Sequence, residues 1–524
     1  MFSKREASEG NPAGERELAV RGVPDEGSTA ETYAGKIHVR WDQDAAVTPF
    51  GQLVFFIDFL KTAGLWESWV KECPLKYKSH NAPTKPDVLG TILLAVLAGH
   101  SRYAHVTALR FDSVSPQQLG MSKVCSEDSV RRAFHGADEQ ECASWLTRHL
   151  SISYEPLLRE PWILDVDTTV KPLYGHQEGA VKGYNPGKQG RPSHACHTYF
   201  VAGIRLVLDV EVQAGNQTAS SYAQPGLWKF IDGLPAEARP AFIRGDCGWG
   251  TEGMMTGAEK RKIPYLFKLK QTGKVKKLIQ QAFTRLDWKD AGQGFQGVEA
   301  ELELQGWTRK RRVIVLRRRI EDEIVLAAET KRLAGSTSQQ QLALGFVVPV
   351  KDGPLYEYAV LVTALPDEIL SITQHYRDRA DVENNFDELK NQWGWSGFTT
   401  HDLNRCQIMA RTIALIYNWW SLFVRLAIPE KHAEAITSRP LLLNAVGRQT
   451  THAGQTTITV TSMHAKANKM RAALHSISSF LASIRSAAEQ LTFPQRWLLI
   501  LSQVFRHLLK GRQLGQPRFM PAPG

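Results

Sequence analysis

Cysteine is scarce in this sequence, and its spacing argues against a disulfide or zinc framework. The 524 residues contain six scattered cysteines, none of which forms a C-x-x-C pair. We therefore expect free thiols and a reducing compartment. His194, Cys196 and His197 lie together in the segment HACH. A zinc site there would need a second ligand pair at zinc spacing, which the sequence lacks, so ordinary strand residues are the favoured interpretation.

The sequence also lacks an uninterrupted apolar run. Its opening residues, MFSKREASEGNPAGERELA, contain no apolar h-region, so we expect no secretory signal peptide. The longest apolar stretch, residues 408–427, contains Arg411, Asn418 and Arg425. Charges inside such a stretch disfavour a membrane span. We expect no membrane partner and an intracellular location.

Acidic residues are few in the last quarter of the chain. Residues 401–524 contain 15 Lys and Arg but 4 Asp and Glu, and this excess equals the net charge of +11 of the whole chain. Basic surfaces attract polyanions, of which DNA is the commonest. A solvated basic helix bundle without a ligand is the simpler alternative.

The pattern of apolar residues predicts an α/β core between helical flanks. Within residues 160–270 we expect, in order, strands at 162–167, 199–204 and 205–212, a helix at 222–234, a strand at 241–246, a helix at 254–262 and a strand at 265–270. Three strands followed by alternating helices and strands is the element order of a ribonuclease-H-like fold. Residues 285–365 are β-rich and interrupt this order before a helix at 373–391.

These patterns divide the chain into six segments. We expect a disordered tail (1–36), a helical DNA-binding domain (37–155), the first part of the ribonuclease-H-like core (156–280), a β-rich insertion (281–365), the second part of the core (366–428) and a basic helical C-terminal domain (429–524).

Two aspartates lie at the ends of predicted strands. Asp167 ends the strand at 162–167, and Asp246 ends the strand at 241–246 before the turn sequence CGWG. Asp165 has the same side-chain parity as Asp167 and is the reserve candidate. Phosphodiester cleavage without a covalent nucleophile typically uses two divalent cations held by carboxylates, and α/β sheets build sites where strands open into loops. Taken singly, each aspartate is better explained as a turn or helix-cap residue.

The predicted helix at 373–391 gathers mixed charge on one face. Tyr376, Arg379, Glu383 and Lys390 lie three, four and seven positions apart. At about 100° per residue they fall within an arc of roughly 60°. A carboxylate on this face is able to hold a metal, and the cations and the phenol are able to bind phosphate oxygens. Periodicity alone favours a simpler interpretation, a surface face with an ion pair between Arg379 and Glu383.

The same four residues match a known signature. Tyr376, Arg379, Glu383 and Lys390 have the spacing of the YREK signature, and over about residues 160–425 the chain resembles the DDE transposases of bacterial insertion sequences.

Other segments carry the same resemblance. LDVDTT around Asp167 resembles the first-aspartate motif of that family, and RGD, which ends at Asp246, resembles the second. GHQEG at 175–179, with Gly183 and Tyr184, resembles the segment that follows the first aspartate in one branch of these transposases.

The resemblance implies a cut-and-paste transposase with a ribonuclease-H-like core, in which a β-rich insertion separates the second aspartate from the glutamate. It implies two Mg²⁺ (or Mn²⁺) ions held by Asp167, Asp246 and Glu383, while the other three signature residues grip phosphates. The implied partners are double-stranded DNA, as transposon inverted-repeat ends and as target, and a second copy of the chain in the DNA complex. The implied location is the bacterial cytoplasm, at the nucleoid.

Basic residues in the β-rich block are further candidates for DNA contacts. Seven of the eleven residues from 309 to 319 are basic, and we select Arg309, Arg311 and Arg312. In relatives that form hairpin DNA ends, a tryptophan of the insertion stacks on a flipped base, and Trp307 is our candidate. A tryptophan that covers the β core at a hairpin turn is the simpler interpretation.

The segment 126–134 is a candidate recognition helix. It begins with the cap residue Ser126 and places Arg131 and Arg132 in its first turns, where such helices reach base edges. An ordinary surface helix explains the pattern equally well.

Two other classes of protein remain open at this stage. One is a nuclease of the same fold that hydrolyses DNA without strand transfer, and the other is a non-enzymatic DNA-binding protein derived from a transposase. The complete acidic triad argues against the second class.

Overall fold

A computed structural model describes residues 27–42, 44–77, 79, 81–320, 346–348, 355–461 and 465–515. The chain divides into two compact units, residues 1–46 and 47–524. In the first unit, β1 (Ser28–Thr32) pairs antiparallel with β2 (Gly35–Val39), and all residues of both strands are exposed. The prediction of a disordered tail over residues 1–36 is therefore wrong from Ser28 onwards, because β-branched residues flank a turn at Gly35, whose φ is +99°. Residues 1–26 lie outside the described residues.

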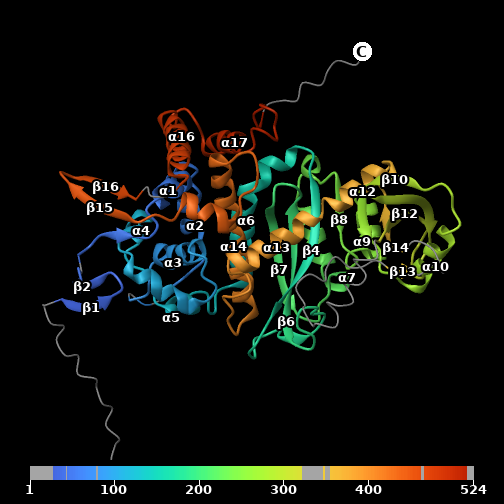
Figure 1. Cartoon of the computed structure of the whole chain (residues 1–524), viewed down its shortest axis with the longest axis horizontal. Coiled ribbons are helices and arrows are strands. Elements are labelled where there is room, and N and C mark those ends of the chain that lie inside the picture. Colours follow the sequence, from blue (N-terminus) through green and yellow to red (C-terminus); the bar gives the residue numbers. More distant parts are fainter. Residues whose placement is uncertain are drawn as a thin grey trace, which may run out of the picture. The chain divides into compact units, whose positions relative to one another are not determined.

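One mixed sheet dominates the second unit (Figure 1). In the described residues it has eleven strands in the order β10-β11-β12-β14-β9-β8-β4-β6-β5, with β13 paired to β14 and β7 paired to β6. The strands are β4 (Ile163–Pro172), β5 (Val181–Lys182), β6 (Pro192–Val201), β7 (Leu206–Ala214), β8 (Phe242–Gly245), β9 (Tyr265–Lys268), β10 (Lys289–Gly292), β11 (Phe295–Leu302), β12 (Arg311–Arg319), β13 (Phe346–Val348) and β14 (Tyr356–Thr363).

The strands nearest the candidate acids follow the predicted element order. β4, β6 and β7 are antiparallel neighbours, whereas β8 and β9 are added in parallel beside β4. β6 is buried from Ser193 to Val201, because it lies between β4 and β7 in the interior of the sheet. This order and mixed pairing fit a ribonuclease-H-like core.

The β-rich insertion continues the core sheet. β14 pairs antiparallel with β9, through Leu361 opposite Lys268, and β12, β11 and β10 follow outward. The insertion was expected to interrupt the core, but its β-branched strands extend the same sheet and share its buried faces. Residues 321–345 and 349–354 of the expected insertion lie outside the described residues.

Helices from the two ends of the second unit share one core. The helices on the N-terminal side are α1 (Leu53–Thr62), α2 (Leu65–Glu72), α3 (Lys85–Leu97), α4 (Val114–Gln118), α5 (Glu127–Arg132) and α6 (Glu139–Tyr154), with 3₁₀ helices η1 (Tyr103–Phe111) and η2 (Glu155–Arg159). Those on the C-terminal side are α14 (Leu403–Ala427), α15 (Ala435–Leu442), α16 (Ala467–Ser486) and α17 (Phe493–Val504). Phe59 meets the ring of Trp497 at 6.3 Å, and the Trp497 indole donates to the Ile152 carbonyl at 2.6 Å. The two helical domains expected at the flanks therefore pack as one body.

The C-terminal segment was expected to be helical throughout, but it also contains a hairpin. β15 (Gly447–His452) pairs with β16 (Gln455–Val460) and with β3 (Val47–Thr48). The hairpin is rich in threonine, a β-branched residue, which favours strands. None of the described helices is both long and apolar enough to cross a membrane.

The remaining helices pack near the strands of the core. They are α7 (Ala219–Tyr222), α8 (Gln224–Asp232), η3 (Ala236–Ala238), α9 (Glu252–Lys260), α10 (Gly273–Ala282), α12 (Ile369–Arg377) and α13 (Ala380–Gln392). The helices predicted at 222–234 and 254–262 are confirmed as α8 and α9. The single helix predicted at 373–391 is wrong, because the chain forms α12 and α13 with a break between them.

Candidate active site

The two candidate aspartates lie level on adjacent strands. β4 and β8 are parallel, and their register pairs Val166 with Gly245. Asp167 and Asp246 each follow one of these paired residues, so they occupy the same level of the sheet. Asp246 directly follows the last residue of β8, which ends one position before the predicted strand end, but β4 continues beyond Asp167, because the residues after it still pair with β6.

Asp246 lies in a tight turn. Its carboxylate accepts a hydrogen bond from the Gly248 amide at 2.8 Å, and its carbonyl accepts one from the Trp249 amide at 3.1 Å. Gly245 permits this turn, since a Cβ there would lie 2.9 Å from the Val166 side chain. The turn and the parallel register together fix Asp246 beside Asp167.

The break between α12 and α13 places the other signature residues. Tyr376 lies in the last turn of α12, and Arg379 is the N-cap residue of α13 with φ −65° and ψ −20°. The Arg379 amide donates to the Tyr376 carbonyl at 3.2 Å, a tight i→i−3 bond. The backbone thus stays near helical values through the break, so the signature residues remain grouped although the helix is not continuous.

Arg379 forms an ion pair with Asp167. Its guanidinium lies 2.6 Å from the Asp167 carboxylate, whose other oxygen accepts from the Thr168 amide at 2.7 Å. Burial raises the pKa of Asp167 to about 7; Arg379 opposes this shift, whereas the charges of Asp246 and Glu383 add to it. The three acids therefore lie within electrostatic reach of one another.

Glu383 and Lys390 complete this face of α13. The Glu383 carboxylate lies 4.0 Å from Arg379, and its side chain is 50% exposed. Lys390 is partly buried, and burial lowers the pKa of its ammonium group, against the influence of Cys196 and Asp167. Burial likewise raises the pKa of the Tyr376 phenol. The Nε of Arg379 is buried without a hydrogen-bond partner. A buried N–H donor without a partner, next to the half-exposed Glu383 carboxylate, suits an anionic ligand that accepts its hydrogen bond.

The carboxylate of the reserve candidate, Asp165, forms an ion pair with Arg244. Both side chains are buried, and the guanidinium donates two hydrogen bonds to the carboxylate, one of them at 2.8 Å. Arg244 also donates to the His375 carbonyl in α12. This ion pair joins β4, β8 and α12 behind the site, a role for Arg244 that its place in the RGD segment does not reveal.

Carboxylates are suitable ligands for a divalent metal, but the three acids are not arranged as one coordination site. Their oxygens suit Mg²⁺ or Mn²⁺, and the pKa of Asp167 is raised mainly by burial, with a further contribution from the charges of Asp246 and Glu383. Within the described part of the chain, however, no group of three or more His, Cys, Asp or Glu side chains is placed to hold a metal ion. Asp167 instead faces Arg379, and Glu383 lies half in solvent.

Comparison with protein families decides the class of the molecule. The model of the transposase DDE domain group 1 family matches residues 76–481, which is more than half of the chain. The chain belongs to this transposase family. No curated protein matches. Among solved structures, a cryo-EM structure of a piggyBac transposase synaptic complex with hairpin DNA is similar at 9% identity and a TM-score of 0.35, over 91% of this chain and 87% of that chain.

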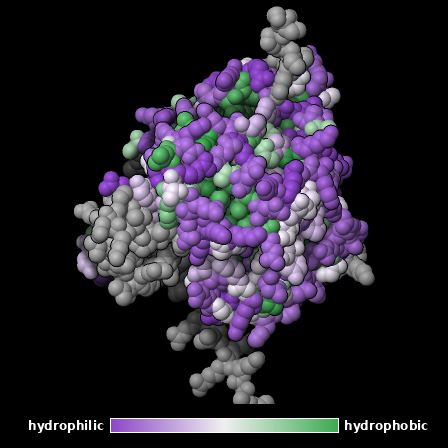
Figure 2. Space-filling view, turned by 90° about the vertical axis from the view of Figure 1, so that its right-hand side faces the viewer, coloured by the Kyte–Doolittle hydropathy of each residue, from purple (hydrophilic) through white to green (hydrophobic). Residues whose placement is uncertain are grey.

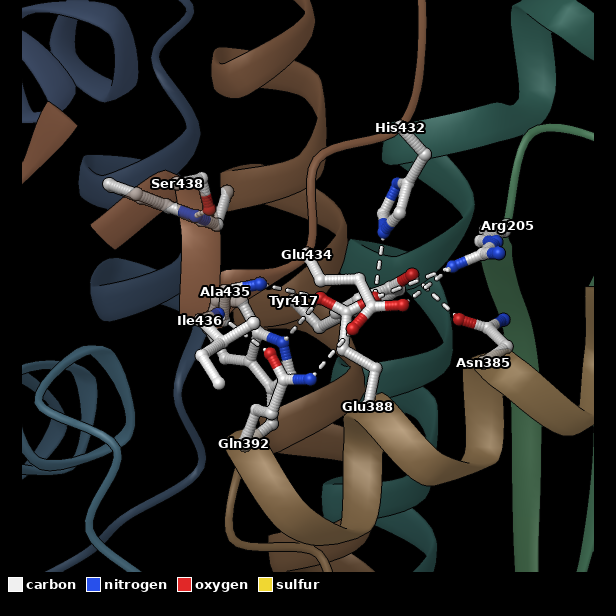
Figure 3. Close-up of polar contacts among 12 residues, drawn as sticks. Arg205, Asn385, Glu388, Gln392, Tyr417, His432, Glu434, Ala435, Ile436 and Ser438 are labelled. Atoms are coloured by element: carbon white, nitrogen blue, oxygen red, sulfur yellow. Dashed lines mark hydrogen bonds and ion pairs between the residues drawn. The ribbon is translucent and has the colours of Figure 1, made fainter. Parts of the chain in front are cut away.

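The rear face of α13 in this transposase is a polar network that the sequence did not indicate (Figure 3). Glu388 is 1% exposed, and its carboxylate accepts hydrogen bonds from His432 at 2.7 Å, from Trp393 at 3.1 Å and from the Ala435 amide at 3.0 Å. Arg205 lies 4.0 Å away. Burial raises the pKa of Glu388, but the hydrogen bonds from His432 and Trp393 outweigh it and lower the pKa. The network fixes α13 against the segment that joins α14 to α15.

Arg205 ties the same helix to the β6–β7 turn. It has a left-handed backbone, with φ +57°, and its guanidinium lies 2.5 Å from Asp381 and 3.5 Å from Glu434. On the neighbouring turn of α13, Tyr417 donates to Asn385 at 2.7 Å. α13 is thus held from behind by α14, α15 and the core sheet.

The basic run of the insertion is largely neutralised by acids. Arg311 is 4% exposed and contacts Glu252 at 2.5 Å and Glu259 at 2.9 Å, so its guanidinium is enclosed by protein, and its contact with DNA stays a prediction. Arg309 reaches Glu259 at 2.9 Å, and Arg312 reaches Glu299 at 2.6 Å. Glu252 and Glu259 lie about fifty positions before the run and Glu299 lies on the neighbouring strand β11, so counting the basic residues overestimated its charge.

The remaining predicted DNA contacts and the HACH cluster have ordinary partners. Trp307 is partly buried against the core, with the Arg311 guanidinium 5.2 Å from the centre of its ring. Arg131 and Arg132 are exposed on α5 and pair with Asp128 at 2.5 Å and 3.2 Å. His194 contacts the Glu178 carbonyl, and His197 contacts Thr168. Contact of Trp307, Arg131 or Arg132 with DNA stays a prediction.

Figure 2 shows the face of the second unit that lies at the right of Figure 1, where the strands of the insertion form one end of the sheet. Most of the coloured surface there is hydrophilic, with a small hydrophobic group near its middle.

Proposed function

We propose that this transposase cuts DNA at the ends of a bacterial insertion sequence and joins the freed 3′-OH to target DNA. The observation that carries the proposal is the register of β4 and β8, which sets Asp167 beside Asp246 within electrostatic reach of Glu383. Three acids on two strands and a facing helix are the donor set for phosphodiester chemistry.

Asp167, Asp246 and Glu383 would hold two Mg²⁺ or Mn²⁺ ions. When bound, such ions activate water and stabilise the leaving oxygen. For Asp167 to serve as a ligand, Arg379 must release the carboxylate that it holds at 2.6 Å. Glu383 is half exposed, so its carboxylate is accessible to an ion from solvent.

The other signature residues would bind DNA. Arg379, with its unsatisfied Nε, is suited to a phosphate oxygen, and Lys390 would add a second cation on the same side. Tyr376 would donate a hydrogen bond to a phosphate, since burial keeps its phenol protonated. None of the three is needed to accept or release a proton.

The proposed reaction has two balanced steps. Water adds to the phosphorus at the end of the element, and the bond to the 3′ oxygen breaks, which leaves a 3′-OH and a 5′-phosphate. The 3′-OH then attacks a second phosphodiester and displaces its 3′ oxygen. We place this chemistry in a homodimer on DNA, in the bacterial cytoplasm at the nucleoid, with the basic C-terminal quarter as a further DNA-holding region.

The decisive experiment compares Glu383→Gln with Asp387→Asn on the gene together with its native flanking DNA. Both remove an exposed carboxylate from α13, one turn apart. Glu383→Gln should lower Mg²⁺-dependent cleavage about a thousand-fold, because a metal ligand contributes several kcal/mol to the transition state. It should leave DNA binding intact, and Asp387→Asn should cleave as the wild-type chain does. Normal cleavage by Glu383→Gln would sink the assignment.

Strand transfer separates the proposal from its rivals. Joined products in the same assay support a transposase, whereas hydrolysed ends alone would indicate a nuclease of the same fold. DNA binding without any metal-dependent cleavage would indicate a DNA-binding derivative. The complete set of acids around Asp167 argues against the third outcome, and the joined products decide between the first two.

A further inference from the structure

The segment between β4 and β6, residues 173–191, which includes the two-residue strand β5 and is called the 173–191 loop below, carries positive charge without acidic partners among the described residues. Lys182, Lys188 and Arg191 are exposed, and no carboxylate of the described residues forms an ion pair with any of them. The acid of this loop, Glu178, is engaged elsewhere, since it accepts from the Leu403 amide at the start of α14 at 3.0 Å. The outer part of the loop therefore displays three uncompensated cations.

Two of these cations share one exposed tyrosine. The ring centre of Tyr174 lies 4.8 Å from the Lys188 ammonium and 4.7 Å from the Arg191 guanidinium, and Lys188 also donates to the phenol oxygen. Tyr174 is 67% exposed and Tyr184 is 69% exposed. Two like charges on one ring repel each other, so an anion placed between them would be stabilised. Phosphate is an anion of suitable charge and hydrogen-bonding capacity.

The backbone of this loop is fixed although its side chains are displayed. A Cβ on Gly183 would lie 1.8 Å from the Gly215 carbonyl oxygen, so the loop approaches the end of β7 too closely for any other residue. Asn185 is buried, and its side chain accepts from the Lys188 amide at 3.0 Å. The Glu178 amide donates to the His401 carbonyl at 2.8 Å. A loop fixed in this way holds its cations in place before a ligand arrives.

The loop follows β4, the strand that carries Asp167, so its distance from the candidate acids can be estimated along the chain. β8 ends beside Val166, whereas β4 runs on past Asp167 to Pro172, still paired with β6 (Figure 1). Tyr174 follows seven residues after Asp167, which at about 3.3 Å per residue is roughly 20 Å along the strand. DNA bound at the acids and running along β4 would meet the loop about six base pairs away, at about 3.4 Å per pair.

We propose that the 173–191 loop is a DNA-backbone-binding surface that holds the duplex next to the cleaved phosphate. Lys182, Lys188 and Arg191 bind phosphates, and Tyr174 spaces two of them. The inference rests on the proposed function, because it assumes that the duplex reaches Asp167. It names a partner surface that neither the YREK residues nor the basic C-terminal quarter includes.

Binding to a fluorescent 40-base-pair duplex of arbitrary sequence tests this surface at several salt concentrations. The variant Lys182→Ala/Lys188→Ala/Arg191→Ala should bind about ten-fold more weakly, and the slope of log affinity against log salt should fall by about 2 to 3, because each lost phosphate contact removes roughly 0.9. A second variant, Lys188→Glu/Arg191→Glu, should weaken binding further. All these side chains are exposed, so the melting temperature should not change.

A matched control removes the same charge elsewhere. Lys229, Lys260 and Lys277 are exposed and lie outside the loop, and their triple alanine variant should keep the wild-type slope. An equal loss in loop and control variants, or an unchanged slope in the loop variant, overturns the proposal. Those outcomes overturn the loop proposal alone. If the wild-type chain shows no salt-dependent duplex binding at all, the proposed function fails as well.

Discussion

Helix α13 has two polar faces that differ in how completely their charges are paired. On the rear face, the buried Glu388 accepts three hydrogen bonds and lies near Arg205. On the front face, Glu383 lies half in solvent, and the nearby Arg379 has a buried Nε without a partner. The two glutamates are five positions apart, or about 140° around the helix.

This difference separates a structural role from a ligand-binding one. Buried polar groups in folded proteins are nearly always hydrogen-bonded, so a saturated carboxylate needs no ligand to explain it. An unsatisfied donor beside acids whose charges raise the pKa of Asp167 is instead typical of a functional site. Glu388 therefore positions α13, while Glu383 and Arg379 are left to meet metal and DNA.

The largest expected effect is on stability and comes from Glu388→Ala. This change leaves the donors of His432, Trp393 and Ala435 buried and unpaired, so the free energy of unfolding should fall by about 3–5 kcal/mol. Glu383→Ala removes a half-exposed carboxylate and should cost less than about 1 kcal/mol. Urea denaturation of both variants measures the difference. Equal losses would break the distinction between the two faces.

The same contrast exists between two arginines of the insertion. Arg311 is buried between Glu252 and Glu259, whereas Arg309 is mostly exposed. Burial raises the pKa of Glu259, but hydrogen bonds from Arg311 and Arg309 outweigh burial and lower this pKa to about 2. Arg311→Met should cost about 2 kcal/mol, less than loss of Glu388 because water reaches both acids.

Arg309→Ala is the matched control for that change and should cost under about 0.5 kcal/mol. Duplex binding should not change with Arg311→Met, since the guanidinium is not accessible. A change in DNA affinity from Arg311→Met at unaltered stability would support the sequence-based hypothesis that this residue contacts DNA.

The sequence predicted the elements near the site better than it predicted their partners. Strand periodicity located Asp167 and Asp246, and spacing grouped Tyr376, Arg379 and Glu383 although the helix breaks between the first two. Periodicity reports which face of an element is apolar, not which element covers it. Separate helical domains and a separate insertion were therefore expected where the chain has a shared core and a shared sheet.

Ion pairs between distant residues are the clearest example of what a single sequence does not reveal. Asp165 and Asp167 have the same parity on β4, yet one pairs with the buried Arg244 and the other with Arg379. The choice depends on which cation the fold brings to each carboxylate. For the same reason, the basic residues at 309–319 appear unpaired in the sequence. The 173–191 loop is notable in the sequence for its glycines rather than for its cations.

The smallest expected effect is the pH dependence of the Glu388 network. The folded state lowers the pKa of this carboxyl below its ordinary 4.5, so its ionised form stabilises the fold. That contribution is fully present above pH 4.5 and is lost as the pH falls through the folded-state pKa. Glu388→Gln, which keeps the shape but not the charge, should therefore be less stable than the wild-type chain by about 1–2 kcal/mol at about pH 7, where bonds to a charged group are strongest. The gap should narrow below pH 4.5.

His432 and Arg205 face the same carboxyl; Arg205 keeps its charge throughout this pH range, and the comparison is repeated in a His432→Asn background to remove the imidazole. If the stability gap between the chain with Glu388 and the Glu388→Gln chain narrows at low pH in this background too, Glu388 is the titrating group. A gap that stays constant from about pH 7 to about pH 4 would mean that the carboxyl acts through its shape alone, and the two faces of α13 would then differ in packing rather than in charge.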